Sequence, residues 1–308
     1  MNSAWAAEVE AREYPLPPRT YVHDVAPSPE PGGPVWYTAQ RDGALGKLDP
    51  ATGKTEHIAL GKGSAPHGVI IGPDGAPWVT DGGQNAIVRV DPKTNEVKVW
   101  RLPAGSREAN LNTAAFDHQG RIWFTGQNGI YGRLDPKTGA MQVWEAPKGF
   151  GPYGITVTPK GEVYFASLAG SYVGRLDLET GAAEVLEPPT QEQGARRVWS
   201  DSKGGVWVSE WNAGNLSRYD TLTKQWKTYK LPGDKEHAYA VYVDDHDVVW
   251  VSDWGANAIL RFDPSTEQFQ AIPSTRSGAN VRQIHGRSGE VWVPESGQGR
   301  IVLLRTGE

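Results

Sequence analysis

Short apolar segments recur along the whole chain, and each is bounded by a turn sequence rich in Gly, Pro or Asp. Segments of this length between such turns are typical of β-strands. No stretch carries a sustained apolar period of 3.6 residues, so the pattern gives no support to helices. The sequence therefore predicts an all-β protein with many tight turns.

One of these segments carries an aromatic residue in the same local context seven times, as in Val-Trp-Val-Ser. The smallest step between these residues is 41 (123 to 164) and the largest is 45 (78 to 123). A four-stranded propeller blade takes about 40–45 residues. We predict a seven-bladed β-propeller that forms a single domain over residues 1–308. The aromatic anchors are Trp36, Trp78, Trp123, Tyr164, Trp207, Trp250 and Trp292.

Each unit repeats the same internal order. An apolar strand such as 67–71 is followed by a Gly/Asp turn (72–75) and the aromatic strand. A third strand ends at an Asp, and a Pro-containing turn such as 135–139 leads to a fourth strand. Proline presets the backbone for such turns, and glycine accepts the positive φ at their end.

The last unit lacks a fourth strand, because the sequence stops shortly after 300–305. Residues 12–17, near the N-terminus, resemble the fourth-strand motif of the other units. We expect this N-terminal strand to complete the last blade, which would close the ring and remove an exposed sheet edge.

The first strands of a propeller line its central channel. Counting back from each anchor gives one equivalent first-strand position per blade, and none of the seven is aliphatic: His23, His67, Asn112, Tyr153, Arg196, Tyr239 and Arg282. A second set lies three residues after each anchor and includes four acidic residues: Asp81, Glu210, Asp253 and Glu295. A convergence of such side chains predicts a binding or catalytic pocket for a small molecule in the channel.

Each residue type in this pocket has a chemical role. His23 and His67 are the candidate catalytic bases, since histidine exchanges protons near pH 7. The four acidic residues are candidate ligands for a divalent cation, Mg²⁺ or Ca²⁺. The other five first-strand residues are candidate ligand-binding groups, because arginine favours anionic or carbonyl groups.

A structural interpretation competes with each of these roles. Polar residues in a wet channel are often only solvated, and Arg196 and Arg282 would then neutralise Glu210 and Glu295. The acidic residues would instead form hydrogen bonds at the hairpin ends of their own blades.

Two segments, 66–81 and 151–167, resemble the repeats of the virginiamycin B lyase (streptogramin lyase) family, and the similarity extends over all seven units. The resemblance implies a monomeric seven-bladed propeller that opens the ester of a cyclic depsipeptide antibiotic by elimination, with magnesium. It also implies a base histidine and a metal-binding glutamate in an E-P-H-G-I motif of the last blade. A second glutamate follows that blade's aromatic strand, and a substrate-contacting histidine lies one blade earlier.

This chain departs from the family pattern at most of these positions. The base position is Arg282, the first metal position is Asn280 and the substrate-histidine position is Tyr239. Only Glu295 keeps its type. Arginine is protonated at any ordinary pH and is a poor general base. The family's catalytic residues are therefore mostly unmatched.

The composition argues against a nucleic-acid-binding protein and against a membrane-spanning one. Lys and Arg number 31 against 36 Asp and Glu, and no basic run occurs, so a nucleic-acid partner is not expected. No apolar run approaches the roughly 20 residues that a membrane span needs, and there is no cysteine. The small-residue step Ala4-Trp5-Ala6 resembles the end of a signal peptide, which favours a periplasmic or secreted protein and leaves a cytoplasmic one open.

Three functions fit these observations. The first is a metal-dependent enzyme similar to virginiamycin B lyase, with an altered substrate. The second is a non-catalytic propeller that binds a ligand or a protein. The third is a calcium-dependent hydrolase similar to a lactonase, for which the acidic residues would be the metal ligands.

Overall fold

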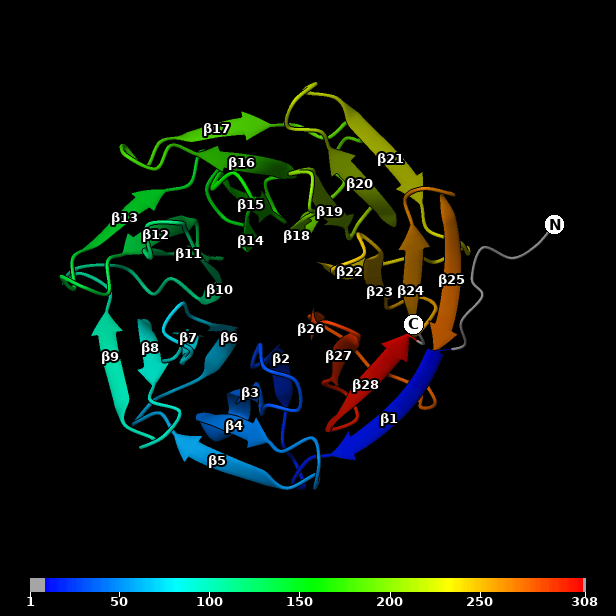
Figure 1. Cartoon of the computed structure of the whole chain (residues 1–308). Coiled ribbons are helices and arrows are strands. Elements are labelled where there is room, and N and C mark those ends of the chain that lie inside the picture. The colour runs from blue at the N-terminus through cyan, green and yellow to red at the C-terminus, as the bar shows by residue number, and fades with distance from the viewer. Residues whose placement is uncertain (1–8, 307–308) are drawn as a thin grey trace.

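Seven four-stranded antiparallel sheets surround one central axis, as Figure 1 shows. The structure is a computed structural model and describes residues 9–306. The all-β, seven-bladed prediction is confirmed, and within 9–306 the helical content is one 3₁₀ turn, η1 (Gln40–Asp42). No helix in this range has the length and apolar character to cross a membrane.

The strands follow the order predicted from the repeat, with the first strand of each blade innermost. Blades one to three consist of β2 (Val22–Pro27), β3 (Val35–Ala39), β4 (Ala44–Leu48), β5 (Thr55–Ala59); β6 (Pro66–Ile71), β7 (Pro77–Asp81), β8 (Ala86–Val90), β9 (Val97–Arg101); and β10 (Leu111–Phe116), β11 (Ile122–Gly126), β12 (Ile130–Leu134), β13 (Met141–Glu145). Blades four to six consist of β14 (Pro152–Val157), β15 (Val163–Ser167), β16 (Tyr172–Leu176), β17 (Ala183–Leu186); β18 (Ala195–Ser200), β19 (Val206–Glu210), β20 (Asn215–Tyr219), β21 (Trp226–Lys230); and β22 (Ala238–Val243), β23 (Val249–Asp253), β24 (Ala258–Asp263), β25 (Gln268–Pro273). Blade seven consists of β26 (His285–Arg287), β27 (Glu290–Glu295), β28 (Arg300–Thr306) and β1 (Val9–Pro15).

Strand β1 is the outer strand of the last blade. It pairs antiparallel with β28, from Val9 opposite Thr306 to Pro15 opposite Arg300 (Figure 1). Tyr14 is 2% exposed, its ring centroid lies 5.5 Å from that of Trp292, and its hydroxyl donates to the Pro50 carbonyl at 3.0 Å. The two ends of the chain therefore close the ring together, as residues 12–17 predict.

The aromatic anchors are buried. In several blades, the turn before the aromatic strand supplies a hydrogen-bond acceptor for the indole N–H of the anchor. Trp123 donates to Asp117 at 2.9 Å, and Trp207 donates to Asp201 at 3.1 Å. A buried indole N–H without an acceptor would be costly. The Asp of this turn therefore has two roles: it belongs to the turn, and it accepts the hydrogen bond of the buried indole.

The innermost strands of blades one to six each contain a register shift against the second strand, as between Ala195 and Val198 in β18. A bulge of this kind adds a residue and interrupts the alternation of side chains. Two consecutive side chains, such as Arg196 and Arg197, then both reach the axis, and both guanidinium groups lie near the Tyr153 ring. The channel therefore has two tiers of side chains.

Candidate functional site

The upper tier, which we call the axial ring, consists of the seven predicted first-strand residues: His23, His67, Asn112, Tyr153, Arg196, Tyr239 and Arg282. The structure brings these side chains together around the axis. The imidazole centroids of His23 and His67 are 3.7 Å apart, and the Asn112 amide contacts Nε2 of His67 at 3.3 Å. Across the ring, the hydroxyl groups of Tyr153 and Tyr239 are hydrogen-bonded.

Both histidines of the axial ring are held in a neutral form. Burial lowers the pKa of each well below its usual value, and nearby Arg197 lowers both further. Nδ1 of His23 lies 2.7 Å from Oδ1 of Asp24, and Nδ1 of His67 lies 3.1 Å from the Asn112 carbonyl. Because both partners are acceptors, Nδ1 carries the hydrogen in each ring and Nε2 keeps a lone pair.

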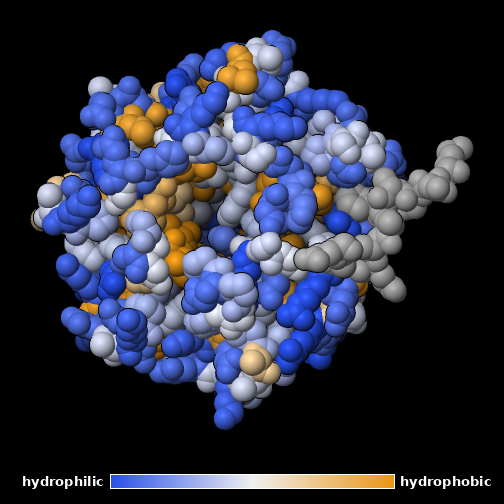
Figure 2. All heavy atoms as spheres, viewed as in Figure 1, coloured by the Kyte–Doolittle hydropathy of each residue, from blue (hydrophilic) through white to orange (hydrophobic). Residues whose placement is uncertain are grey.

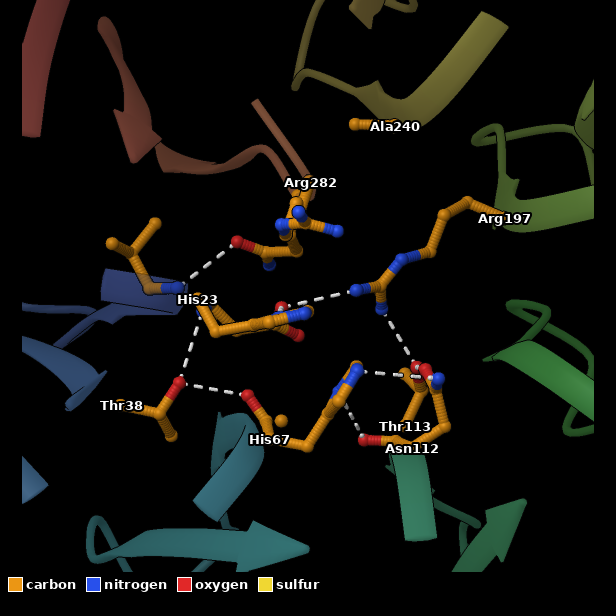
Figure 3. Close-up of polar contacts among 12 residues, drawn as sticks. His23, Thr38, His67, Asn112, Thr113, Arg197, Ala240 and Arg282 are labelled. Carbon is orange, nitrogen blue, oxygen red and sulfur yellow. Dashed lines mark hydrogen bonds and ion pairs between the residues drawn. The ribbon is translucent and has the colours of Figure 1, made fainter. Parts of the chain in front are cut away.

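A buried ion pair lies in the tier below. Asp24 and Arg197 are 2% and 4% exposed, and Nη2 of Arg197 lies 3.0 Å from Oδ1 of Asp24. Nη1 of Arg197 donates to Thr113 at 2.6 Å, so this side chain joins three blades across the channel (Figure 3). Counting one residue per blade missed this pair. Its only signal in the sequence is a second polar residue directly after a predicted axial position.

Two guanidinium groups of the axial ring have aromatic neighbours instead of carboxylates. Arg196 lies 3.5 Å from the Tyr239 ring centroid and 4.4 Å from that of Trp211. Arg282 lies 4.9 Å from the Trp254 centroid and donates to the Tyr239 hydroxyl at 3.5 Å. Neither forms an ion pair within residues 9–306, and the Nε atom of each is buried without an acceptor.

Glu210 and Glu295 do not neutralise these two arginines, so that structural alternative is wrong. Ser217 and Asn215 donate to Glu210 at 2.6 and 2.9 Å, and burial raises the pKa of the Glu210 carboxyl. Glu295 pairs with Arg300 at 2.5 Å. Both carboxylates therefore take partners from their own blades.

The four acidic candidates also fail to converge. Asp81 accepts from the Ser64 hydroxyl at 2.5 Å and from the Ala65 amide at 2.9 Å. Asp253 accepts from the His237 amide at 2.9 Å. In the part of the chain that the structure describes, no group of three ligating residues includes any of the four. The structure does not bring the four candidate ligands together: Asp81, Asp253 and Glu295 each accept from the loop that enters their blade, and Glu210 accepts from the next strand, β20.

Two other groups of residues place potential metal-ligand atoms close to one another. His23, Asp24 and His67 place one potential ligand atom each within 4.8 Å of one another. Arg197 already contacts Asp24, and the positive charges of Arg196 and Arg282 act on His23. Such an environment repels a divalent cation. A second group, Asp244 to His246, lies in a surface turn.

The family positions also lack the donors that magnesium needs. Magnesium prefers carboxylate oxygens, whereas Asn280 and Arg282 occupy the first metal position and the base position. Glu295 is 3% exposed and accepts from Ser274 at 2.7 Å in addition to its ion pair with Arg300. The residues present do not fit the family's metal.

The fold and the axial ring together define a seven-bladed propeller with an arginine- and aromatic-lined channel. Comparison with known proteins assigns its family: residues 3–261 match the model of the virginiamycin B lyase family, and the chain belongs to this family. Solved structures agree on the fold. Virginiamycin B lyase from Staphylococcus aureus superposes with a TM-score of 0.88 at 22% identity, covering 97% of this chain and 99% of the other.

Two further structures have the same fold. A catalytically inactive virginiamycin B lyase from Staphylococcus aureus with quinupristin gives a TM-score of 0.86 at 23% identity, over 97% and 99% of the two chains. An extracellular domain of a putative one-component system from B. thetaiotaomicron gives 0.75 at 15% identity, over 96% of this chain and 39% of the other. Among curated proteins, a gluconolactonase from Zymomonas mobilis is 36% identical over 77 residues, which are 24% of this chain and 22% of that protein.

Proposed function

We propose that this protein binds a small anionic molecule at the face of the axial ring that carries Arg196 and Arg282. The observation that supports this most directly is that both guanidinium groups are partly buried and have no carboxylate partner within residues 9–306. Removing charge from water without a counter-charge is costly. An anionic ligand that accepts from the unpartnered Nε atoms would offset that cost.

The aromatic residues around these arginines indicate which kind of group the ligand carries next to its anionic group. Trp211 and Trp254 are half-buried, His237 is exposed, and the ring centroids of Trp211 and His237 are 4.8 Å apart. Flat aromatic surfaces beside a cationic centre favour a ligand with an apolar or aromatic body next to its anionic group. An aromatic carboxylate combines both features.

This proposal departs from the chemistry of the best-known family members. The base and first metal positions hold Arg282 and Asn280, so an elimination that needs a histidine and magnesium there has lost its essential groups. A calcium-dependent hydrolase is also disfavoured, because within residues 9–306 no three ligating residues that include any of these four carboxylates come together, and each of the four accepts hydrogen bonds within or beside its own blade.

A second candidate function is proton abstraction from the bound anion by His23. The observation that favours it is the 2.7 Å contact between Nδ1 and Asp24, which leaves Nε2 as a free base with a fixed orientation. A carboxylate that holds a histidine in this way is a common arrangement in general-base catalysis.

The binding proposal is tested by isothermal titration calorimetry with benzoate, 2-naphthoate and succinate. We expect saturable binding that weakens as salt is raised and is strongest for an aromatic anion. Arg282→Gln should weaken it about tenfold or more, the usual range for a charge-assisted hydrogen bond. Arg276→Gln is the matched control, because Arg276 is exposed on the outer side of blade seven. The proposal fails if none of the three anions binds, or if both variants bind as well as the wild type.

A further inference from the structure

A second hollow lies in the channel, on the other side of the axial ring. It has a volume of about 320 Å³, and its lining begins at the lower tier and continues to the ends of the innermost strands at residues such as Ile71 and Val157. None of the seven axial-ring residues contributes to that lining. Figure 2 shows the centre of this face hollowed, with hydrophobic side chains on the wall over β6, β10 and β14.

The walls of this cavity are unusually apolar for a solvent-accessible channel. They include Ile71, Phe116, Val157 and Val198 from four neighbouring blades. Apolar surface left in contact with water is unfavourable, and concave apolar surface of this kind is typical of small-molecule sites. The walls therefore favour a ligand with a hydrophobic body.

The floor of the cavity is polar and has an unused donor. Arg197 lines the cavity, is 4% exposed, and uses Nη1 for Thr113 and Nη2 for Asp24. Its Nε atom is buried and has no acceptor. Buried N–H groups are nearly always satisfied, so this one indicates an acceptor supplied by another molecule.

The charge around the floor favours an anionic acceptor. Arg196, Arg197 and Arg282 meet at the axis, and Asp24 is the one carboxylate that pairs with any of them within residues 9–306. The two histidines beside them are neutral because burial lowers their pKa. An excess of positive charge therefore remains at the closed end of an apolar cavity.

We propose that this cavity is a second binding site, which takes a small amphipathic carboxylate with its head on Arg197 and its tail along the apolar walls. The volume lies at the lower end of the roughly 300–1,000 Å³ that small-molecule pockets occupy, so a ligand of modest size fits. This size corresponds to a medium-chain fatty acid such as octanoate. The proposal does not depend on anion binding at Arg282, since none of the seven axial-ring residues lines this cavity.

The test is calorimetry with octanoate and 1-octanol, which have the same chain and differ in the head group. We expect one octanoate per protein, and binding of 1-octanol weaker by about tenfold or more, since the alcohol lacks the charge. Absence of octanoate binding overturns the proposal, and equal affinity for the two compounds overturns the role given to Arg197.

Two pairs of variants locate the site. Val157→Trp fills the cavity from its wall and should abolish octanoate binding, whereas Val157→Ala, the matched control, should retain it. Arg282→Gln should weaken octanoate binding far less than Val157→Trp, because Arg282 adds positive charge near the floor but does not line the cavity. Loss of octanoate binding in Arg282→Gln with retention in Val157→Trp would overturn the second site and place octanoate at the anion site instead. Because Val157 is half-buried, whereas Arg197 is 4% exposed and paired with Asp24, these variants should disturb the fold less than Arg197→Ala.

Discussion

Asp24 and Arg197 are 173 positions apart in the sequence, yet their side chains meet at 3.0 Å on the propeller axis. Asp24 comes from blade one and Arg197 from blade five. Nδ1 of His23 contacts the same carboxylate oxygen at 2.7 Å. One carboxylate therefore links the orientation of the candidate base to the arginine that forms the floor of the second cavity.

Breaking this ion pair on one side should cost stability. Asp24→Asn leaves a buried guanidinium without its counter-charge, and losses of about 3–5 kcal/mol are usual in such cases. The double variant Asp24→Asn/Arg197→Gln should lose less than the sum of the single variants. Urea denaturation measures all three. The exposed pair Arg107 and Glu145 is the control, and its removal should cost under about 1 kcal/mol. Additive losses would show that the two side chains are not coupled.

Closure of the ring should depend on the packing of Tyr14. Tyr14→Ala removes a buried aromatic ring that contacts Trp292, which typically costs about 3 kcal/mol or more. Glu10→Ala, on an exposed position of the same strand, should change the free energy of unfolding by under about 0.5 kcal/mol. Thermal and urea unfolding report both variants. Equal stability of the two would contradict a structural role for β1.

Stability should fall as the pH is lowered from about 6.5 to 4. Burial lowers the pKa of His285 to about 4 and that of His23 and His67 well below 6.5, so the unfolded chain binds these protons first. Each histidine then lowers the free energy of unfolding by up to about 1.4 kcal/mol per pH unit in this window. Asp24 and Glu210 act in the opposite direction, because burial raises the pKa of both carboxyl groups, but they are two groups against three.

The measurement is the free energy of unfolding at several pH values. His285→Gln should reduce the slope between pH 6.5 and 4 by about one proton. His246→Gln, on a side chain that is 77% exposed, is the control variant. An unchanged slope in His285→Gln would mean that this imidazole is protonated in the folded protein.

Cleavage of streptogramin B should be absent or very weak. Arg282 and Asn280 replace the base and the first metal ligand that the family resemblance assigns, so neither proton abstraction nor charge stabilisation is supplied there. Chromatography of the antibiotic after incubation with pure protein and magnesium measures ring opening. Robust magnesium-dependent opening would show that another residue, with His23 the first to test, has taken over as base.

The fold was predictable because short sequence motifs specify its strands and turns, and these motifs recur in every blade. The seven aromatic anchors and the motif at 12–17 each predict an element, and the structure contains all of them. The axial ring followed from the same count, since equivalent positions of a repeat lie at equivalent places around the axis. Its side chains do meet, as the His23–His67 contact shows.

The rest of the site depends on geometry that the sequence does not display. The acidic set shares a position in the repeat, but Asp81 and Glu295 turn toward local hydrogen-bond donors and not toward the axis. Asp24 and Arg197 were missed because a bulge, which composition does not mark, presents a second residue per blade to the channel.

The pairing of β1 with β28 also sets a minimum time for folding. Val9 cannot pair until its partner Thr306 has been synthesised, and Pro15 cannot pair until Arg300 has been synthesised. At 5–20 residues per second, the ribosome needs roughly 15 to 60 s to make the chain between them. During that interval blade seven is incomplete and the nascent ring stays open, so this propeller completes its fold only after nearly all of it has been synthesised.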